Sequence, residues 1–381
     1  MRVLMISKAC VVGAYQRKLE ELAACPNIEL TVAVPPYWRD ERGLTPLERA
    51  RTAGYELIVE PMAFNGNFHL HFYPRLGQLM ARLRPEVVHI DEEPYNFATW
   101  HAQRLARRAG AKTLFFSWQN ILRRYPFPFN WIEREVLRRA DAAIVGNAEA
   151  QAVWRAKGYA GPVWVIPQFG VDEEAFSPHP RPLSIANGDG EGRGGRGERG
   201  EVFVVGYAGR LVPEKGVDVL LRALAQLPKI TQLHVRGAGP ELPHLRALAA
   251  QRRIADRVRF DPLLPSTQMP DYYRSLDCLV LPSRTRPNWK EQFGRVLIEA
   301  MACGVPVVGS TCGEIPNVIG EAGLIFPEGE ASALAAQLAA LLDNPAQRAA
   351  LAQAGRARVL ERFTQRRIAE QTAAVYHALR P

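Results

Sequence analysis

Residues 202–221 read VFVVGYAGRLVPEKGVDVLL and combine a strand, a glycine turn and a helix. The apolar run from Val202 to Tyr207 predicts a buried strand, and the apolar spacing after Gly216 predicts an amphipathic helix. Gly209 follows the strand, where a glycine lets the backbone approach a ligand. The helix that follows offers free amide groups at its positive end, so the turn favours a phosphate-binding site.

Two cations, Arg210 and Lys215, flank this turn, and both side chains can reach a diphosphate bound there. The same residues also fit a second interpretation, a solvated turn with two unrelated cations.

A second candidate element runs from Glu291 to Ala300 and reads EQFGRVLIEA. It follows the apolar strand 278–281, and its amide groups at the start of the helix are expected to face the same ligand. Glu299 lies a little over two helical turns beyond Glu291 among apolar residues, where a carboxylate needs donors such as ribose hydroxyls. The alternative is an exposed helix-terminal acid and a satisfied buried carboxylate. The amides in question belong to Gly294, Arg295 and Val296.

Strand-like apolar runs alternate with helical patterns along both halves of the chain, which predicts α/β architecture with parallel sheets covered on both faces. The composition changes sharply at 177–201, where GDGEGRGGRGERG cannot bury enough apolar surface to order itself. The expected organisation is a first domain over 1–176, a flexible linker over 177–201, a second domain over 202–362 and a terminal helix over 363–381. The strand-like runs are 2–7, 29–34, 87–90, 113–117, 142–145, 163–166, 202–207, 232–235, 257–260, 278–281 and 305–308.

The composition fits a globular protein with two domains, since the chain has 381 residues, 47% of them hydrophobic and 23% charged. No window approaches the roughly 20 apolar residues that span a bilayer, and no secretory leader is recognisable, so a cytoplasmic protein is expected. The five cysteines and eight histidines show no metal-binding spacing, and no metal site is expected.

The formal net charge of +9 indicates an anionic partner. The segment 104–139 carries nine Lys and Arg residues against Glu133 and Glu135, which leaves a solvated helix face, an acidic membrane surface and nucleic acid open as interpretations. No nucleic-acid-reading motif accompanies it, so no nucleic acid is expected as partner. Four aromatic residues nearby could hold a lipid-linked acceptor against the inner face of the cytoplasmic membrane, or simply pack a proline-rich loop. They are Tyr125, Phe127, Phe129 and Trp131.

Motifs spread over residues 140–360 resemble retaining glycosyltransferase family 4 of the GT-B fold. That resemblance implies two Rossmann-like, doubly wound parallel-sheet domains with an interdomain cleft, and a C-terminal helix that packs back on the first domain. The motifs are Gly209-Arg210 with Lys215-Gly216, Gly237-Ala238-Gly239-Pro240, Leu281-Pro282-Ser283, the spacing of Glu291 and Glu299, and MACGVPVV over 301–308.

The resemblance also implies roles for single residues. Arg210 and Lys215 would bind the donor diphosphate, Glu291 would orient the sugar hydroxyls, and these three form the expected catalytic set. Glu299 would bind the ribose. Further donor contacts would come from Gly209, Gly237, Gly294, Arg295 and Val296.

The first half matches the family pattern less closely. Gly13 stands where paired glycines are common, and Gln119 and Asn120 stand where the family often has a histidine. The resemblance implies that all three contact the donor. A glutamine can position a donor sugar but cannot carry a proton. The cluster Asp91-Glu92-Glu93-Pro94-Tyr95 follows the strand 87–90 at its carboxyl end, where open α/β sheets place ligands. It is expected to contact the acceptor, with Glu93 and Tyr95 as the binding residues, or to act as base. A turn with capping acids is the alternative.

The expected function is transfer of a hexose from a nucleoside diphosphate sugar to a hydroxyl of a glycan, lipid-linked or small-molecule acceptor, with retention of configuration. The nucleotide sugar is a co-substrate, and no further cofactor is expected. Two alternatives remain: a catalytically silent nucleotide-sugar-binding protein of the same fold, and a basic nucleic-acid-binding protein.

Overall fold

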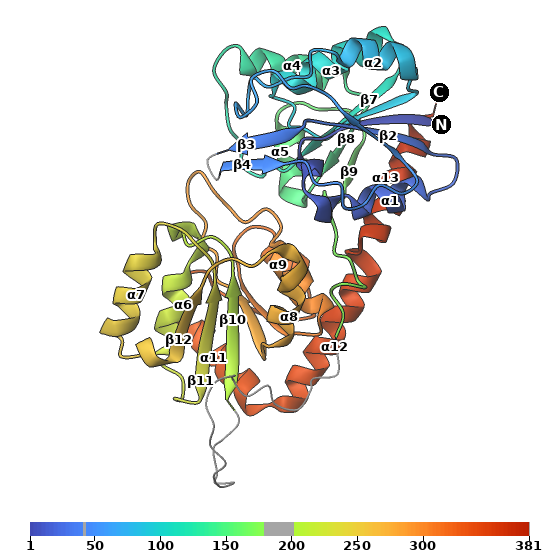
Figure 1. Cartoon of the computed structure of the whole chain (residues 1–381). Coiled ribbons are helices and arrows are strands. Elements are labelled where there is room, and N and C mark those ends of the chain that lie inside the picture. Colours follow the sequence, from blue (N-terminus) through green and yellow to red (C-terminus); the bar gives the residue numbers. More distant parts are fainter. Residues whose placement is uncertain (41–42, 179–201, 381) are drawn as a thin grey trace. The chain divides into compact units, whose positions relative to one another are not determined.

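The computed structural model describes residues 1–40, 43–178 and 202–380 and divides the chain into two compact units (Figure 1). Unit 1 comprises Met1–Asp172 together with Arg362–Pro381, and unit 2 comprises Glu173–Glu361. The segment predicted as a linker lies outside the described residues from 179 to 201.

Unit 1 is built on a seven-stranded sheet in the order β5-β2-β1-β6-β7-β8-β9, and every neighbouring pair is parallel. The central strands are buried from end to end, as the continuous apolar runs in the sequence predict. A separate antiparallel hairpin, β3 (Tyr37–Asp40) and β4 (Gly43–Pro46), follows β2. The strands of the sheet are β1 (Arg2–Ile6), β2 (Glu29–Val34), β5 (Glu56–Val59), β6 (Val87–Ile90), β7 (Lys112–Ser117), β8 (Ala142–Val145) and β9 (Val163–Val165).

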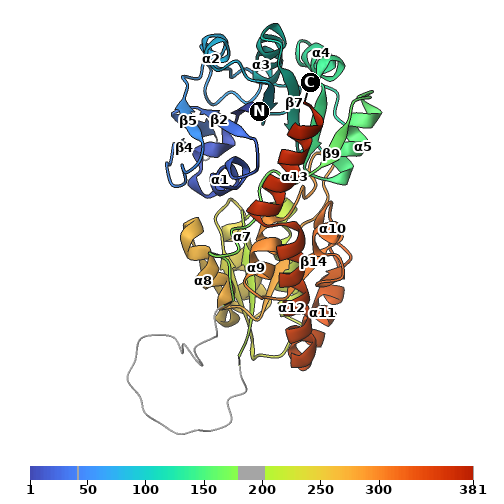
Figure 2. The ribbon, with the colours of Figure 1, turned by 90° about the vertical axis from the view of Figure 1, so that its right-hand side faces the viewer.

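Helices cover both faces of this sheet. On one face α1 (Arg17–Ala23) packs beside α13 (Gln365–Ala378), although nearly the whole chain separates them (Figures 1 and 2). Ile368 and Tyr376 of α13 are fully buried there with Met5 and Leu22. The other face carries α2 (Leu76–Leu83), α3 (Phe97–Arg108), α4 (Phe129–Arg139) and α5 (Ala148–Ala156).

Unit 2 is built on a six-stranded parallel sheet in the order β12-β11-β10-β13-β14-β15. Its largest apolar core joins one face of the sheet to α6 (Val217–Leu224), α7 (Leu242–Gln251) and α11 (Ala331–Asp343). The helices α8 (Met269–Arg274), α9 (Arg295–Ala302), α10 (Ile315–Ile319) and α12 (Pro345–Arg362) complete the unit. The strands are β10 (Phe203–Ala208), β11 (Thr231–Arg236), β12 (Val258–Asp261), β13 (Cys278–Leu281), β14 (Val307–Ser310) and β15 (Leu324–Phe326).

The prediction of two doubly wound parallel-sheet domains is confirmed, and the predicted strands lie within one or two residues of the observed ones. Two edge strands were missed. The strand β5 has no fully buried residue, and β15 has only three residues, so neither carries the apolar run that marks a central strand. No helix among the described residues is long and apolar enough to cross a bilayer.

Candidate functional site

The turn after β10 closes against the end of β13. Gly216 immediately precedes α6 with a φ of +66°, and a Cβ atom at this position would lie 2.0 Å from the Pro282 carbonyl oxygen. Only glycine fits such a close approach in the left-handed region. The neighbouring 3₁₀ turn, Pro213–Lys215, therefore lies directly beside the segment that follows β13.

Lys215 and Glu291, 76 residues apart, meet in this place. The Lys215 ammonium donates to Glu291 Oε2 at 2.6 Å, and the buried Ser283 hydroxyl donates to the same oxygen at 2.8 Å. The Trp289 ring lies 4.8 Å from Lys215 Nζ. Charge-assisted hydrogen bonds of this kind hold a carboxylate in a fixed position, so Glu291 is an oriented acid in a largely buried setting.

Arg210 lies near the same group but is more accessible. Its guanidinium is 3.8 Å from Glu214, and its side chain is 46% exposed. Its carbonyl accepts a hydrogen bond from the Tyr207 hydroxyl at 2.8 Å. Burial raises the pKa of Tyr207, the negative charge of Glu291 raises it further, and the Arg210 charge opposes both effects. Glu291 and Arg210 thus both lie close enough to the Tyr207 hydroxyl to influence it.

The helix α9 begins at Arg295, four residues after Glu291. Gly294 precedes its first residue with a φ of +79°, and the amides of Arg295 and Val296 belong to its open first turn. Glu299, nearly buried, forms an ion pair with Arg295 at 2.7 Å and accepts a hydrogen bond from the Tyr273 hydroxyl at 2.7 Å. The predicted ribose-binding carboxylate is thereby fixed within its own helix and by α8.

The two glycine loops of unit 2 are adjacent. The amide of Leu211 donates to the Ala238 carbonyl at 2.8 Å, and the amide of Gly209 donates to the last residue of β11 at 3.0 Å. A Cβ on Gly237 would lie 2.2 Å from the Gly209 carbonyl oxygen. The structure therefore groups the predicted unit 2 residues at the carboxyl ends of β10, β11 and β13, where open parallel sheets bind ligands.

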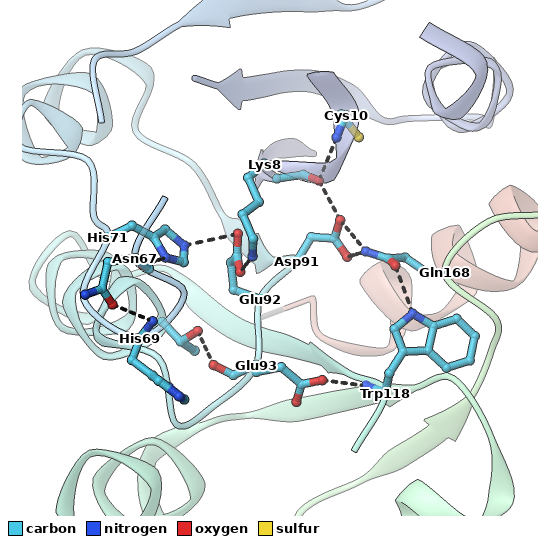
Figure 3. Close-up of polar contacts among 12 residues, drawn as sticks. Lys8, Cys10, Asn67, His69, His71, Asp91, Glu92, Glu93, Trp118 and Gln168 are labelled. Carbon is cyan, nitrogen blue, oxygen red and sulfur yellow. Dashed lines mark hydrogen bonds and ion pairs between the residues drawn. The ribbon is translucent and has the colours of Figure 1, made fainter. Parts of the chain in front are cut away.

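Unit 1 contains a separate cavity of about 830 Å³ at the carboxyl ends of its own central strands. Three consecutive acids after β6 reach it, and Figure 3 shows that each has a different set of partners. Aromatic side chains form much of the remaining wall. The residues used below are Lys8, Trp38, Phe68, Glu93, Trp118 and Gln168.

The first acid, Asp91, belongs to a chain of hydrogen bonds. The Ser7 hydroxyl donates to it at 2.6 Å, the Gln168 amide donates at 2.9 Å, and Trp118 Nε1 donates to Gln168 Oε1 at 2.9 Å (Figure 3). Burial raises the pKa of Asp91, and Lys18 and these donors oppose the effect.

The second acid, Glu92, is ionised, and a neighbouring cation balances its negative charge. Burial alone would raise its pKa, but the charge of Lys8 and the neighbouring His71 ring hold the pKa of Glu92 at about 2. Lys8 forms an ion pair with it and lies over the Phe68 ring, 4.9 Å from the centroid. The cation and the carboxylate therefore cancel within the cavity wall.

The third acid, Glu93, has a pKa close to neutral pH. Burial raises its pKa to about 7, although the Ser117 hydroxyl donates at 2.6 Å and the Trp118 amide at 2.8 Å. A carboxyl group with such a pKa exchanges a proton readily near pH 7.

The other predicted residues of unit 1 are not among those that line the cavity. The Gly13 amide donates to the Glu48 carboxylate at 2.6 Å. Gln119 is buried and donates to the Ile121 carbonyl, and Asn120 donates to Glu149 at 3.2 Å. Tyr95 packs in an aromatic cluster, with its ring stacked 4.2 Å from that of Tyr125. Their predicted contacts with donor or acceptor stay predictions.

Several cavity residues escaped the sequence reasoning. Lys8 lies two residues beyond the end of β1, and Glu92 lies two residues beyond the end of the neighbouring strand β6, so the rule that parallel strands end at one edge could have paired them. Trp38 lies in the hairpin strand β3 and Gln168 in a loop, and neither segment has the continuous apolar run that marks a central strand. Among the described residues, no group of three or more His, Cys, Asp or Glu side chains is arranged to hold a metal ion.

Two family models match the chain. The model described as "Glycosyl transferases group 1" matches residues 191–358, and "Glycosyl transferase 4-like domain" matches residues 12–168. One match lies within each unit and spans most of it.

Relatives in sequence are glycosyltransferases as well. A GDP-mannose-dependent alpha-(1-6)-phosphatidylinositol monomannoside mannosyltransferase of Mycolicibacterium smegmatis is 32% identical over 66% of this chain and 66% of its own length. A D-inositol 3-phosphate glycosyltransferase of Streptomyces bingchenggensis is 32% identical over 64% of this chain, which spans 54% of that relative.

The solved structures show the fold. Sucrose-phosphate synthase from Thermosynechococcus elongatus superimposes with a TM-score of 0.73 at 23% identity, over 100% of this chain and 99% of that one. HepE of Anabaena in complex with UDP gives a TM-score of 0.73 at 20% identity, over 99% and 100% of the two chains. With both family models matched and the same double α/β architecture, the chain belongs to the group 1 glycosyltransferases of the GT-B fold.

Proposed function

We propose that the protein is a retaining glycosyltransferase that moves a hexose from a nucleoside diphosphate sugar to an acceptor hydroxyl. The observation that carries the proposal is the convergence of Lys215 on Glu291 beside the open first turn of α9. The first relative named above is GDP-mannose-dependent, and HepE binds UDP, which supports a nucleotide sugar as donor.

In this proposal unit 2 holds the donor. Lys215, Arg210 and the first-turn amides of α9 would stabilise the negative charge that develops on the departing diphosphate, so no metal ion or further cofactor is required for that task. Glu291 would accept hydrogen bonds from the sugar hydroxyls and hold the anomeric carbon in place. The acceptor oxygen then forms the new glycosidic bond, the bond to the diphosphate breaks, and a phosphate oxygen takes the acceptor proton.

The cavity of unit 1 is our candidate for acceptor binding. Its aromatic walls at Trp38, Phe68 and Trp118 suit the apolar face of a sugar ring. The carboxyl groups of Asp91 and Glu93 offer acceptors for the hydroxyls. An acceptor carried by a lipid would bring the enzyme to a membrane face, and we include peripheral association with the cytoplasmic membrane in the proposal.

The experiment combines donor binding with turnover. Melting temperature is measured with a panel of UDP-, GDP- and ADP-sugars, because a ligand at 100 times its Kd stabilises the folded form by about 2.7 kcal/mol. The stabilising donor is then used in a turnover assay with a panel of glycan, lipid-linked and small-molecule acceptors.

Lys215→Ala is expected to lower kcat/KM at least about 100-fold, the usual cost of losing one group that stabilises a developing negative charge. Lys229→Ala, at an exposed lysine of the same unit, is the matched control and should leave turnover unchanged. Unchanged kinetics of Lys215→Ala with its donor would contradict the proposal. Donor binding without turnover on any acceptor would instead favour a silent nucleotide-sugar-binding protein, the candidate that the non-titrating Gln119 favours.

A further inference from the structure

A second cavity, of about 460 Å³, lies in unit 1 between the neighbouring helices α3 and α4, away from the acid-lined cavity. Two indole rings form part of its wall, with their centroids 5.7 Å apart. Its lining residues are Trp100, Gln103, Arg104, Arg107, Arg108, Trp131, Glu135 and Arg139. None of these side chains takes part in the proposed transfer.

The charge of this cavity is strongly positive, with four arginines against one glutamate. Glu135 already forms two ion pairs, with Arg138 at 2.6 Å and with Arg139 at 2.9 Å. Arg107 donates to the Arg139 carbonyl at 3.1 Å, and Arg104 lies over the Trp100 ring at 5.4 Å.

Within the described part of the chain, the structure gives Arg104, Arg107 and Arg108 no acidic partner. All three are exposed. An anion with several oxygens would satisfy them, and a phosphate group matches the forked donor geometry of arginine.

Large apolar side chains are exposed in the cavity wall and in the segment that leads into α4. Trp131, which lines the cavity, is 46% exposed, and the segment leading into α4 carries Leu122 at 61% and Phe127 at 80%. Phe127 is the most exposed large hydrophobic side chain of the described residues. By contrast, Tyr125 and Phe129 pack inward against His69, so only half of the aromatic residues singled out in the sequence remain available.

We propose that this α3/α4 surface docks on a membrane containing anionic phospholipids, with headgroup phosphates bound by the arginines and Trp131 at the level of the lipid headgroups. Indole rings favour the boundary between water and lipid, and each arginine near an anionic bilayer contributes about 1 kcal/mol. Exposed Leu and Phe side chains gain from insertion among acyl chains, whereas they gain little from a nucleic-acid backbone. The inference extends the peripheral association proposed above and does not require transferase activity.

The experiment is co-sedimentation of the full chain with vesicles of phosphatidylcholine alone and of equal parts phosphatidylcholine and phosphatidylglycerol. Wild-type protein is expected to bind the anionic vesicles and not the neutral ones. The double variant R104Q/R108Q should bind at least about tenfold more weakly, since two arginine contacts are lost. Trp131→Ala should also bind more weakly, and a blue shift of tryptophan fluorescence on binding should shrink with it.

The matched control is R246Q/R252Q, which removes the same charge from exposed arginines at α7 in unit 2 and should bind like wild type. Equal loss in both double variants would overturn the proposal, because it would show only an effect of net charge. So would equal binding to both vesicle types, stabilisation by inorganic phosphate as large as by vesicles, or tighter binding to an oligonucleotide. Donor-induced stabilisation should be unchanged in R104Q/R108Q, which separates a failure here from a failure of the proposed function.

Discussion

Glu93 accepts hydrogen bonds from Ser117 and Trp118, and its side chain is partly buried. Because burial raises its pKa from 4.5 to about 7, the folded protein holds this proton more tightly than the unfolded chain does. The stability gained from this proton is fully present below pH 4.5 and is lost as pH rises through about 7.

Glu93→Gln should therefore show a smaller loss of unfolding free energy between pH 5 and pH 8 than wild type. The loss should not vanish, because the pKa of Asp91 is also raised. Urea denaturation at the two pH values measures it, with the exposed Glu29→Gln as control. An unchanged pH dependence in Glu93→Gln would show that Glu93 titrates normally in the folded protein.

Single residues were the hardest part to predict from sequence. The convergence of Lys215 and Glu291 followed from two glycine-marked turns at the ends of neighbouring parallel strands, and the structure brings these two side chains together. The hydrogen-bond and ion-pair partners of single residues could not be predicted from the sequence. Nothing in the sequence near Gly13 announces that Glu48 takes its amide, or that Arg295 and Tyr273 take Glu299, because these partners depend on tertiary packing.

Among the elements, the junction of the 3₁₀ turn and α6 is tightly constrained. Gly216→Ala should lower the free energy of unfolding of unit 2 by about 3 kcal/mol, from a left-handed φ and a clash with the Pro282 carbonyl. Gly329→Ala is the control, since its φ is +85° but no atom lies within 4 Å of the added Cβ.

The control should cost only about 1 kcal/mol. Calorimetry of both variants gives the comparison, and equal losses would mean that the backbone at Gly216 shifts without penalty.

The central strands of both sheets were predictable from the sequence, because a strand buried on both faces is apolar throughout, as in β6 and β8. The half-exposed β5 and the β3–β4 hairpin lack that signature.

At the scale of the whole molecule, unit 1 depends on residues from both ends of the described chain. Ile368, Val375 and Tyr376 of α13 are fully buried in its core, and Tyr376 is hydrogen-bonded to His89 at 2.7 Å. Burying each such apolar side chain contributes about 1.5–3 kcal/mol, a large share of the 5–15 kcal/mol typical of a domain.

A chain ending at residue 362 should therefore lose the cooperative thermal transition of unit 1 and keep that of unit 2. Tyr376→Phe, which removes only one hydroxyl, should cost about 1 kcal/mol. Calorimetry distinguishes the two transitions. Survival of both in the shortened chain would show that α13 is dispensable.

The late position of α13 in the chain also has a consequence for biosynthesis. Residues 173–361 leave the ribosome as one uninterrupted segment, so unit 2 can fold during translation as soon as they emerge. Until residues 362–381 are synthesised, unit 1 lacks α13, and the apolar face that α13 covers stays exposed to solvent. Unit 1, although synthesised first, is thus completed only when α13 emerges, after unit 2.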